Sequence, residues 1–198
     1  SQPYIVALMA EALKLSPDED VLEIGTGSGY AAAVLAGVAR RVYTVERHPE
    51  LADIARERLA RLGYQTVEVR CGDGTLGWAE HAPFSAIVAA AGGPEAPRAL
   101  LDQLAIDGRL VMPIGASRAQ ELVRITRVGA TELKREELGS VQFVPLIGAQ
   151  GWGERTDPRT SRGVWPSRNP GPLRAPSPAS RPALVAKLIA ECAEPIER

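Results

Sequence analysis

The stretch VLEIGTGSGY, residues 21–30, decides the fold of this chain. It opens with an apolar run that contains one acid, and Gly25, Gly27 and Gly29 then follow at alternate positions. Glycine readily adopts positive φ angles and has no side chain, so such a turn lets the backbone come very close to a bound molecule. The stretch therefore predicts a buried strand, a ligand-binding turn and a helix that begins at Tyr30.

Strand-like and helix-like segments alternate through the first two thirds of the chain. Apolar residues at helical spacing predict helices, and short apolar runs that end at turn residues predict strands. The predicted helices cover residues 4–15, 30–40, 50–63 and 96–105, and the predicted strands cover residues 21–24, 42–46, 66–71, 84–91 and 108–115. This alternation implies right-handed crossovers, and hence an α/β fold with a doubly wound, mostly parallel sheet covered on both faces.

Two regions add detail to this prediction. The helix over residues 50–63 is the most clearly amphipathic, and its expected buried face comprises Leu51, Ile54, Ala55, Leu59 and Leu62. After Gly115, the stretches 121–129, 130–139 and 140–148 alternate apolar and polar residues. Such alternation is typical of antiparallel strands, which we expect to close one edge of the sheet.

Composition limits the kinds of partner. The 198 residues are 45% apolar and 24% charged, with a net charge of −1. This balance gives no general attraction to nucleic acid or to an anionic membrane, and no apolar run reaches the roughly 20 residues that cross a bilayer. Residues 153–182 are rich in Pro and Arg, and we interpret them as a solvated tail, with contact to acidic proteins or nucleic acid as the alternative. Residues 183–198 are predicted to form one helix.

The cysteines and histidines indicate no metal site and no disulfide. Cys71 and Cys192 are far apart and follow no metal-ligand spacing, which favours reduced thiols in a cytoplasmic protein. His48 and His81 lie near turn residues without a partner at ligand spacing. We expect both histidines at the surface.

The turn after the first strand predicts a nucleotide-like ligand. Ligands of open α/β sheets bind beyond the carboxyl ends of the strands, and an acid about 20 residues further on can accept both hydroxyls of a ribose. Glu46 stands at that position, and Asp73 ends the next strand, where it can face an adenine ring. The dinucleotide motif G-x-G-x-x-G matches imperfectly, because Tyr30 occupies its third glycine position. A dinucleotide enzyme remains an alternative.

Six blocks of the sequence, together with its opening residues, resemble the protein-L-isoaspartate O-methyltransferase family. The blocks are VLEIGTGSGYAAAVLA, VYTVERHPELADIARERLARLGY, VRCGDGTLGW, APFSAIVAAAG, LLDQLAIDGRLVMPIG and FVPLIGAQGW, and the opening SQPYIVALM is similar to the segment that bears the family's active-site serine. The glycine turn alone would indicate only an S-adenosylmethionine-dependent methyltransferase, whereas GTGSGY, GDGTLGW and VPL together are specific to this family. The resemblance covers residues 1–152, which we predict to be one Rossmann-like methyltransferase domain.

The resemblance implies a role for each matched residue. The active-site serine would be Ser1. The residues implied in binding S-adenosylmethionine are Glu23, Gly25, Thr26, Gly27, Ser28, Gly29, Glu46, Asp73 and Gly74. The residues implied in binding substrate are Gln2, Pro3, Val144, Pro145 and Leu146. The implied reaction is methyl transfer to the free carboxylate of L-isoaspartyl residues in damaged proteins, which begins their repair.

Two alternatives stay open at this point. A methyltransferase of the same architecture could act on another carboxylate or on a small molecule, and a family member could bind the cofactor without catalysis. We expect isoaspartyl-containing proteins and peptides as the substrates, and a monomer. Because the family carries a region before this serine, we also expect the chain to be a fragment that lacks its N-terminal region.

The role implied for Ser1 predicts the effect of removing its hydroxyl group. A hydroxyl that only positions the substrate carboxylate by a hydrogen bond is worth about 10- to 1000-fold in rate. We therefore expect Ser1→Ala to lower turnover of an isoaspartyl peptide by that amount, measured with labelled cofactor. Near-normal turnover would refute the assignment.

Overall fold

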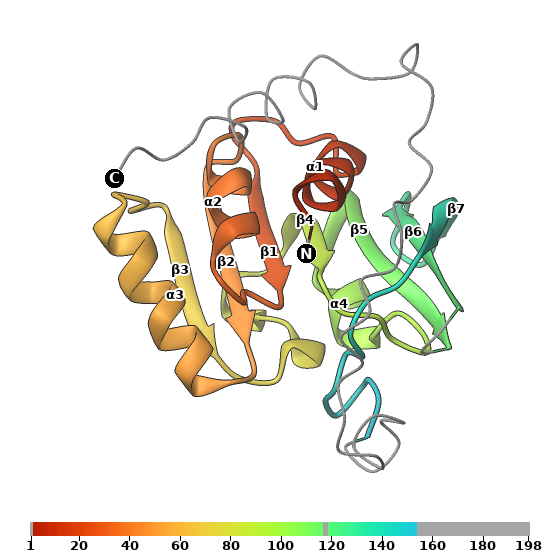
Figure 1. Cartoon of the computed structure of the whole chain (residues 1–198). Coiled ribbons are helices and arrows are strands. Elements are labelled where there is room, and N and C mark those ends of the chain that lie inside the picture. Colours follow the sequence, from red (N-terminus) through yellow and green to blue (C-terminus); the bar gives the residue numbers. More distant parts are fainter. Residues whose placement is uncertain (1, 117–118, 154–198) are drawn as a thin grey trace.

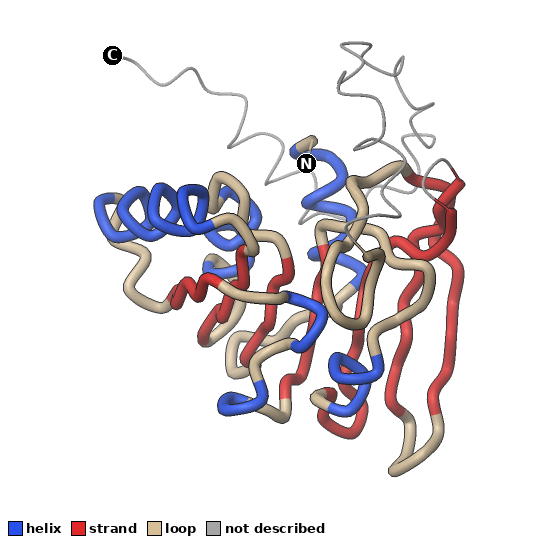
Figure 2. Tube along the Cα trace, turned by 90° about the horizontal axis from the view of Figure 1, so that it is seen from below, coloured by secondary structure: helices blue, strands red, loops and turns tan. Residues whose placement is uncertain are grey.

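The computed structural model describes residues 2–116 and 119–153 of the chain (Figure 1). Ser1, Cys192, the predicted tail after Gly153 and the predicted helix over residues 183–198 lie outside the described residues. The described part forms one seven-stranded sheet with helices on both faces (Figure 2).

The sheet has the predicted doubly wound topology. Its strands are β1 (Asp20–Ile24), β2 (Arg41–Glu46), β3 (Val67–Cys71), β4 (Phe84–Ala89), β5 (Leu104–Ala116), β6 (Ala119–Arg127) and β7 (Leu133–Val141). Their order across the sheet is β3-β2-β1-β4-β5-β6-β7. Every pairing from β3 to β5 is parallel, and β6 and β7 are antiparallel to their neighbours. The predicted fold class, with antiparallel strands at one edge, is confirmed.

Helices cover both faces of the sheet. They are α1 (Pro3–Ala12), α2 (Tyr30–Ala36), α3 (Pro49–Arg61) and α4 (Arg98–Asp102), with two 3₁₀ turns, η1 (Gly74–Leu76) and η2 (Ala79–His81), after β3. α1, α2 and α3 lie on one face, and α4, η1 and η2 lie on the other (Figure 2). Pro3 and Pro49 begin α1 and α3, where a missing amide hydrogen costs nothing. No helix in the described part of the chain is long and apolar enough to cross a bilayer.

The central strands bury side chains on both sides. Val21 of β1 belongs to the core under α1 and α2, which includes Leu35. Leu22, the next residue, belongs to the opposite core, which includes Leu100 of α4. A strand covered on both faces needs apolar residues at successive positions, which is why β1 is apolar from Val21 to Ile24 apart from Glu23.

The predicted buried face of α3 is wrong in part. Leu51, Ile54 and Leu62 are 41%, 48% and 62% exposed. The buried residues of this helix are Ala52, Ala55 and Leu59. Because α3 packs beside β2 and the edge strand β3, only a narrow stripe of the helix meets the sheet.

Two predicted helices are shorter than expected. α2 ends at Ala36, directly before Gly37. α4 covers only Arg98–Asp102, and the residues from Leu104 onward already belong to β5. Leu104 pairs with Phe84 of β4, so pairing within the sheet outweighs the local helical pattern.

The third predicted antiparallel strand, over residues 140–148, does not form: β7 ends at Val141, and no further strand follows in the described part of the chain. Residues 143–152, called the strap below, instead run to the carboxyl ends of the parallel strands (Figure 1). Pro145 forms an isolated bridge with Gly92, which follows β4. Proline has no amide hydrogen to continue a strand ladder, which helps to explain why the alternating pattern fails here.

His81 is not the free surface residue that the sequence suggested. Its ring is partly buried and stacks on the Tyr43 ring, with centroids 4.1 Å apart. The Trp78 ring meets both rings edge-on. This cluster packs η2 and the preceding turn against β2. His48 is exposed, as expected.

Two arginines hold the C-terminal end of α1 against the sheet. Arg109 of β5 pairs with Glu19 at 2.7 Å and donates a hydrogen bond to the Leu13 carbonyl at 2.7 Å. Arg124 of β6 donates to the Ala12 carbonyl at 3.0 Å. The last carbonyls of a helix have no partner within the helix, so these guanidinium groups satisfy them and fasten α1.

We expect Arg109→Ala to lower the free energy of unfolding by about 3 kcal/mol, because it strands the largely buried Glu19 carboxylate. Urea denaturation followed by circular dichroism measures this loss. The hydrogen bond from Arg109 holds the pKa of Glu19 below its ordinary value, so the loss is present at neutral pH and shrinks as the pH falls through the acid range. Arg40→Ala, which breaks an exposed pair with Asp20, is the control. Equal losses in both variants would contradict the anchoring role.

Candidate active site

A cavity of about 810 Å³ opens at the carboxyl ends of β1, β2 and β4. The chain passes from β1 to β2 on one side, while β4 lies on the other side of β1, so the strand order reverses at this point. Ligands of open α/β sheets bind at such a reversal. The walls come from the glycine turn, the ends of β2 and β4, Gly74, the strap and the first turns of α1 and α3.

The glycine turn borders this cavity with bare backbone. Gly25, Gly27 and Gly29 have φ angles of 95°, 53° and 83°, which other residues rarely adopt. A Cβ atom at Gly27 would meet no atom of the described structure within 4 Å, so a ligand can approach the main chain there. Gly29 is the N-cap residue of α2, and it packs against the Leu59 side chain instead.

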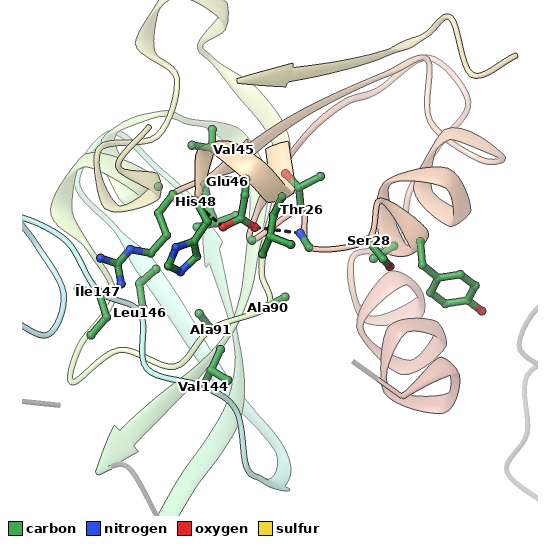
Figure 3. Close-up of a pocket in the computed structure, with 18 of the residues that line it drawn as sticks. Thr26, Ser28, Val45, Glu46, His48, Ala90, Ala91, Val144, Leu146 and Ile147 are labelled. Carbon is green, nitrogen blue, oxygen red and sulfur yellow. Dashed lines mark hydrogen bonds between the residues drawn. The ribbon is translucent and has the colours of Figure 1, made fainter. Parts of the chain in front are cut away.

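Glu46 ends β2, and its buried carboxylate faces the glycine turn (Figure 3). Its Oε2 accepts a hydrogen bond from the Gly27 amide at 2.9 Å, and its Oε1 accepts one from the His48 amide at 3.1 Å. A carboxylate offers about four acceptor positions. Glu46 therefore keeps the capacity to accept two further hydrogen bonds at the cavity wall, such as those from a sugar diol.

Contacts behind the turn fix its path. Thr26 Oγ1 lies 2.6 Å from Thr44 Oγ1, and Arg58 of α3 donates to the Ser28 carbonyl at 2.6 Å. Thr44 Oγ1 also forms a hydrogen bond with Glu23 Oε2 at 2.5 Å. The turn is thereby tied to β2 and α3 by the protein alone.

Glu23 lies behind the turn and does not line the cavity. Within the described part of the chain, no group forms a hydrogen bond with its second oxygen, Oε1. Burial raises the pKa of Glu23 to about 8; the hydrogen bond from Thr44 opposes this effect, and the charge of Glu46 adds to it. Glu23 is therefore mostly neutral at pH 7 and supports the turn as an uncharged acid.

Asp73 also lies outside the lining of the cavity, although Gly74 beside it is part of that lining. Its Oδ1 accepts hydrogen bonds from the Thr75 amide at 2.8 Å and the Thr75 hydroxyl at 2.7 Å, and its Oδ2 accepts one from the Ala149 amide at 2.7 Å. Burial raises the pKa of Asp73, but the hydrogen bonds from Ala149 and Thr75 outweigh this and lower it overall. The carboxylate is thus ionised and engaged with the protein.

The strap forms the wall opposite the glycine turn. Gly92 donates to the Val144 carbonyl at 2.7 Å and accepts from the Leu146 amide at 2.8 Å. The buried side chain of Gln120 accepts from the Phe143 amide at 2.7 Å and donates to the Phe143 carbonyl at 3.4 Å. These bonds satisfy backbone groups that no regular strand pairs, and they hold the strap at the cavity edge.

Most of the site residues predicted from the sequence meet in this cavity. Those that line it are Pro3, Gly25, Thr26, Gly27, Ser28, Glu46, Gly74, Val144, Pro145 and Leu146. Glu23, Gly29 and Asp73 lie next to the lining residues, and Gln2 is exposed directly before α1. Ser1 lies outside the described residues, so its role stays a prediction.

The sequence analysis missed several lining residues. Ala90 and Ala91 follow β4 beside the reversal of strand order, and the rule that ligands bind beyond strand ends would have indicated them. Arg47 and Leu51 also line the cavity, one before α3 and one in its first turn. His48, directly before α3, lines it as well (Figure 3). Helical spacing predicts Leu51 for the buried face of α3, whereas in the structure its side chain is partly exposed and lines the cavity.

The residues present fit an adenosyl cofactor. Small-molecule sites usually measure roughly 300–1,000 Å³, a range that includes this cavity. Glu46 is the one carboxylate among the described lining residues, and it stands beside the open backbone at Gly27. Val45 and Ile147 provide apolar surface of the kind that a purine ring packs against.

The sequence profile of the protein-L-isoaspartate(D-aspartate) O-methyltransferase family matches residues 1–151. The chain belongs to this family. The protein-L-isoaspartate O-methyltransferase of Rhodopseudomonas palustris is 60% identical over 165 residues, which cover 82% of this chain and 75% of the relative. The enzyme of the same name from Protochlamydia amoebophila is 54% identical over 153 residues, which cover 77% of this chain and 73% of the relative. The family resemblance seen in the sequence is confirmed.

Solved structures agree with this membership. One protein-L-isoaspartate O-methyltransferase has a TM-score of 0.71 and 33% identity, and the match covers 76% of this chain and 49% of that protein. This methyltransferase-family chain therefore spans about half the length of that solved chain. A Plasmodium falciparum structure named for the same activity, in complex with S-adenosyl-L-homocysteine, shows the same fold with a TM-score of 0.61 and 24% identity. That match covers 73% of this chain and 72% of the other.

The raised pKa of Glu23 predicts how the protein's stability depends on pH. Folding moves this pKa from 4.5 to about 8, so the native state holds a proton that the unfolded chain releases, and stability falls as the pH rises from about 4.5 to 8. Glu23→Gln removes this dependence. We expect the melting temperature of the variant, relative to the unaltered protein, to rise steadily between pH 5 and pH 8 in scanning calorimetry.

Glu19→Gln is the control with the opposite sign, since Arg109 lowers the pKa of Glu19. Its destabilising effect should be largest at neutral pH and fade in acid. A Glu23→Gln melting difference that does not change with pH would show that the buried acid is ionised.

Proposed function

We propose that this protein transfers a methyl group from S-adenosylmethionine to the free carboxylate of L-isoaspartyl residues in damaged proteins, and so begins their repair. The observation that carries the proposal is the pairing of bare backbone at Gly27 with the buried Glu46 carboxylate at the wall of the cavity. Membership in the family, and the names of relatives that are 54–60% identical, support the choice of substrate.

The cofactor would lie along the glycine turn. The backbone of Gly25, Thr26, Gly27 and Ser28 would meet its methionyl end, and Glu46 would accept hydrogen bonds from its ribose hydroxyls. Gly74 would border the adenine ring, next to Asp73. Gly29 and Glu23 would support the turn without touching the cofactor. Gly29 would turn the chain into α2, and Glu23 would hold Thr44 through a hydrogen bond. When bound, S-adenosylmethionine supplies an electrophilic methyl group on a sulfonium.

The residues around the reacting groups would orient them and exclude water. A substrate carboxylate is already an anion at neutral pH, so the site needs no strong base. A reaction that neutralises two opposite charges is favoured where water is scarce, since water stabilises the separated ions. Val6, Val144 and Leu146 line the cavity with apolar side chains, which would limit the water near the carboxylate.

The substrate would lie between the strap and the start of α1. Val144, Pro145 and Leu146 would run along the peptide, and Gln2 and Pro3 would close the opposite side. The Ser1 hydroxyl would hold the isoaspartyl carboxylate by a hydrogen bond. We propose a monomer that acts in the cytoplasm, a location that the unpaired cysteine pattern favours.

Paired peptides test the proposal. The protein, incubated with labelled S-adenosylmethionine, should methylate an isoaspartyl peptide and leave the aspartyl peptide of the same sequence unlabelled. Label on both peptides or on neither would contradict the proposed function. Cofactor binding without any transfer would point to a binding module, and preferential binding of NAD would point to a dinucleotide enzyme.

Glu46→Gln tests the cofactor site. Hydrogen bonds to a charged group are worth enough that losing them should raise the Kd for S-adenosylhomocysteine about 10- to 100-fold, measured by isothermal titration calorimetry. Glu50→Gln, which neutralises an exposed acid in the first turn of α3, is the matched control and should leave the Kd unchanged. Equal Kd values for both variants would place the ribose away from Glu46.

A further inference from the structure

Two segments that are far apart in the sequence meet beside the cavity through Asp73. The loop after β3 carries Asp73 and Thr75, and the strap carries Ala149 and Gln150. Asp73 Oδ2 accepts a hydrogen bond from the Ala149 amide at 2.7 Å, and Thr75 Oγ1 accepts one from the Gln150 amide at 3.1 Å. The Thr75 hydroxyl in turn donates to Asp73 Oδ1 at 2.7 Å. The Asp73 carboxylate therefore bonds to Ala149 directly and to Gln150 through the Thr75 hydroxyl group.

The strap has no room to lie closer to this carboxylate. A Cβ atom at Gly148 would overlap the Asp73 carboxylate. One at Gly151 would overlap the Leu146 carbonyl oxygen within the strap, and it would also meet the Thr75 side chain at 3.1 Å. Glycine at both strap positions permits the contact. The fit therefore depends on the shape of the strap as well as on the hydrogen bonds.

This link is one of two that hold the strap at the cavity wall. Gly92 holds the strap at Val144 and Leu146, and the Trp152 amide donates to the Leu146 carbonyl at 2.8 Å. The strap residues that contact Asp73 and Thr75, Ala149 and Gln150, lie between Leu146 and Trp152. The cavity-lining part of the strap is therefore held on one side by the chain after β4 and on the other by the loop after β3.

We propose that Asp73 is a positioning residue for the substrate, whose carboxylate fastens the strap to the loop after β3 and thereby sets the placement of Val144, Pro145 and Leu146. This role rests on the proposed function, because those strap residues are the ones expected to run along the substrate peptide. It is additional to the adenine contact that the family resemblance implies for Asp73. The carboxylate accepts three hydrogen bonds from protein donors, which leaves about one of its four acceptor positions.

Asp73→Asn tests this role, because one side-chain oxygen becomes an NH₂ group, which cannot accept a hydrogen bond. The remaining oxygen keeps two bonds by staying with Thr75, which places the NH₂ group against the Ala149 amide and removes that link to the strap. We expect the KM for an isoaspartyl peptide to rise about 10-fold or more. Asp53→Asn, the same substitution at an exposed ion pair on α3, is the matched control and should leave this KM unchanged.

A double-mutant cycle tests the same link from the strap side. Gly148→Ala alone should raise the peptide KM, because its methyl group collides with the carboxylate. In the Asp73→Ala background that space is open, so adding Gly148→Ala should cost little. Strong non-additivity of this kind is expected only of residues in contact. Additive effects would overturn the proposal, and the cycle stands even where Asp73→Asn lowers the melting temperature.

Hydrogen exchange provides a readout that does not depend on catalysis. The Ala149 and Gln150 amides should lose protection in Asp73→Asn and keep it in Asp53→Asn. Unchanged protection, or a raised cofactor Kd with an unchanged peptide KM, would overturn the positioning role while leaving the proposed function in place. Absence of isoaspartyl methylation by the unaltered protein would instead remove the proposed function, and this role with it.

Discussion

The hydrogen bond from the Gly27 amide to the Glu46 carboxylate is the contact on which the rest of the site depends. It joins the turn after β1 to the end of β2, and the same carboxylate accepts the His48 amide at the start of α3. Three chain segments therefore converge on one buried side chain. The positive φ angle of Gly27 makes this approach possible, and the Thr26–Thr44 contact behind it ties the turn to β2.

The parts of the fold and site that could be predicted from the sequence are those that depend on residues close together along the chain. Strand and helix periodicity predicted the order of elements and the parallel sheet, since each crossover is short and its chirality is restricted. The glycine spacing predicted the turn, and distance along the chain predicted the place of Glu46 at the end of the next strand. Each of these inferences needed only residues within about 20 positions of one another.

The parts that were missed depend on contacts between distant residues. Residues 140–148 alternate like a strand, yet their path is decided by Gln120, which pairs with Phe143 through its side chain. The carboxylate of Asp73 bonds to an amide 76 positions away, which no local motif encodes. The exposure of Leu51 follows from where α3 rests on the sheet edge. Helical spacing shows which residues share a face, and tertiary packing decides how much of that face is covered.

The anchoring of α1 has a mechanical consequence. Arg109 and Arg124 clamp one end of the helix, and Pro3 at the other end stands over the cavity. A ten-residue helix is about 15 Å long, so a rotation of about 5° about its C-terminal end would displace its first residue by about 1 Å. A misplacement of that size can cost about 100-fold in rate. Two guanidinium groups remote from the chemistry, together with the buried side chains of α1, thus fix the position of Pro3 at the cavity wall.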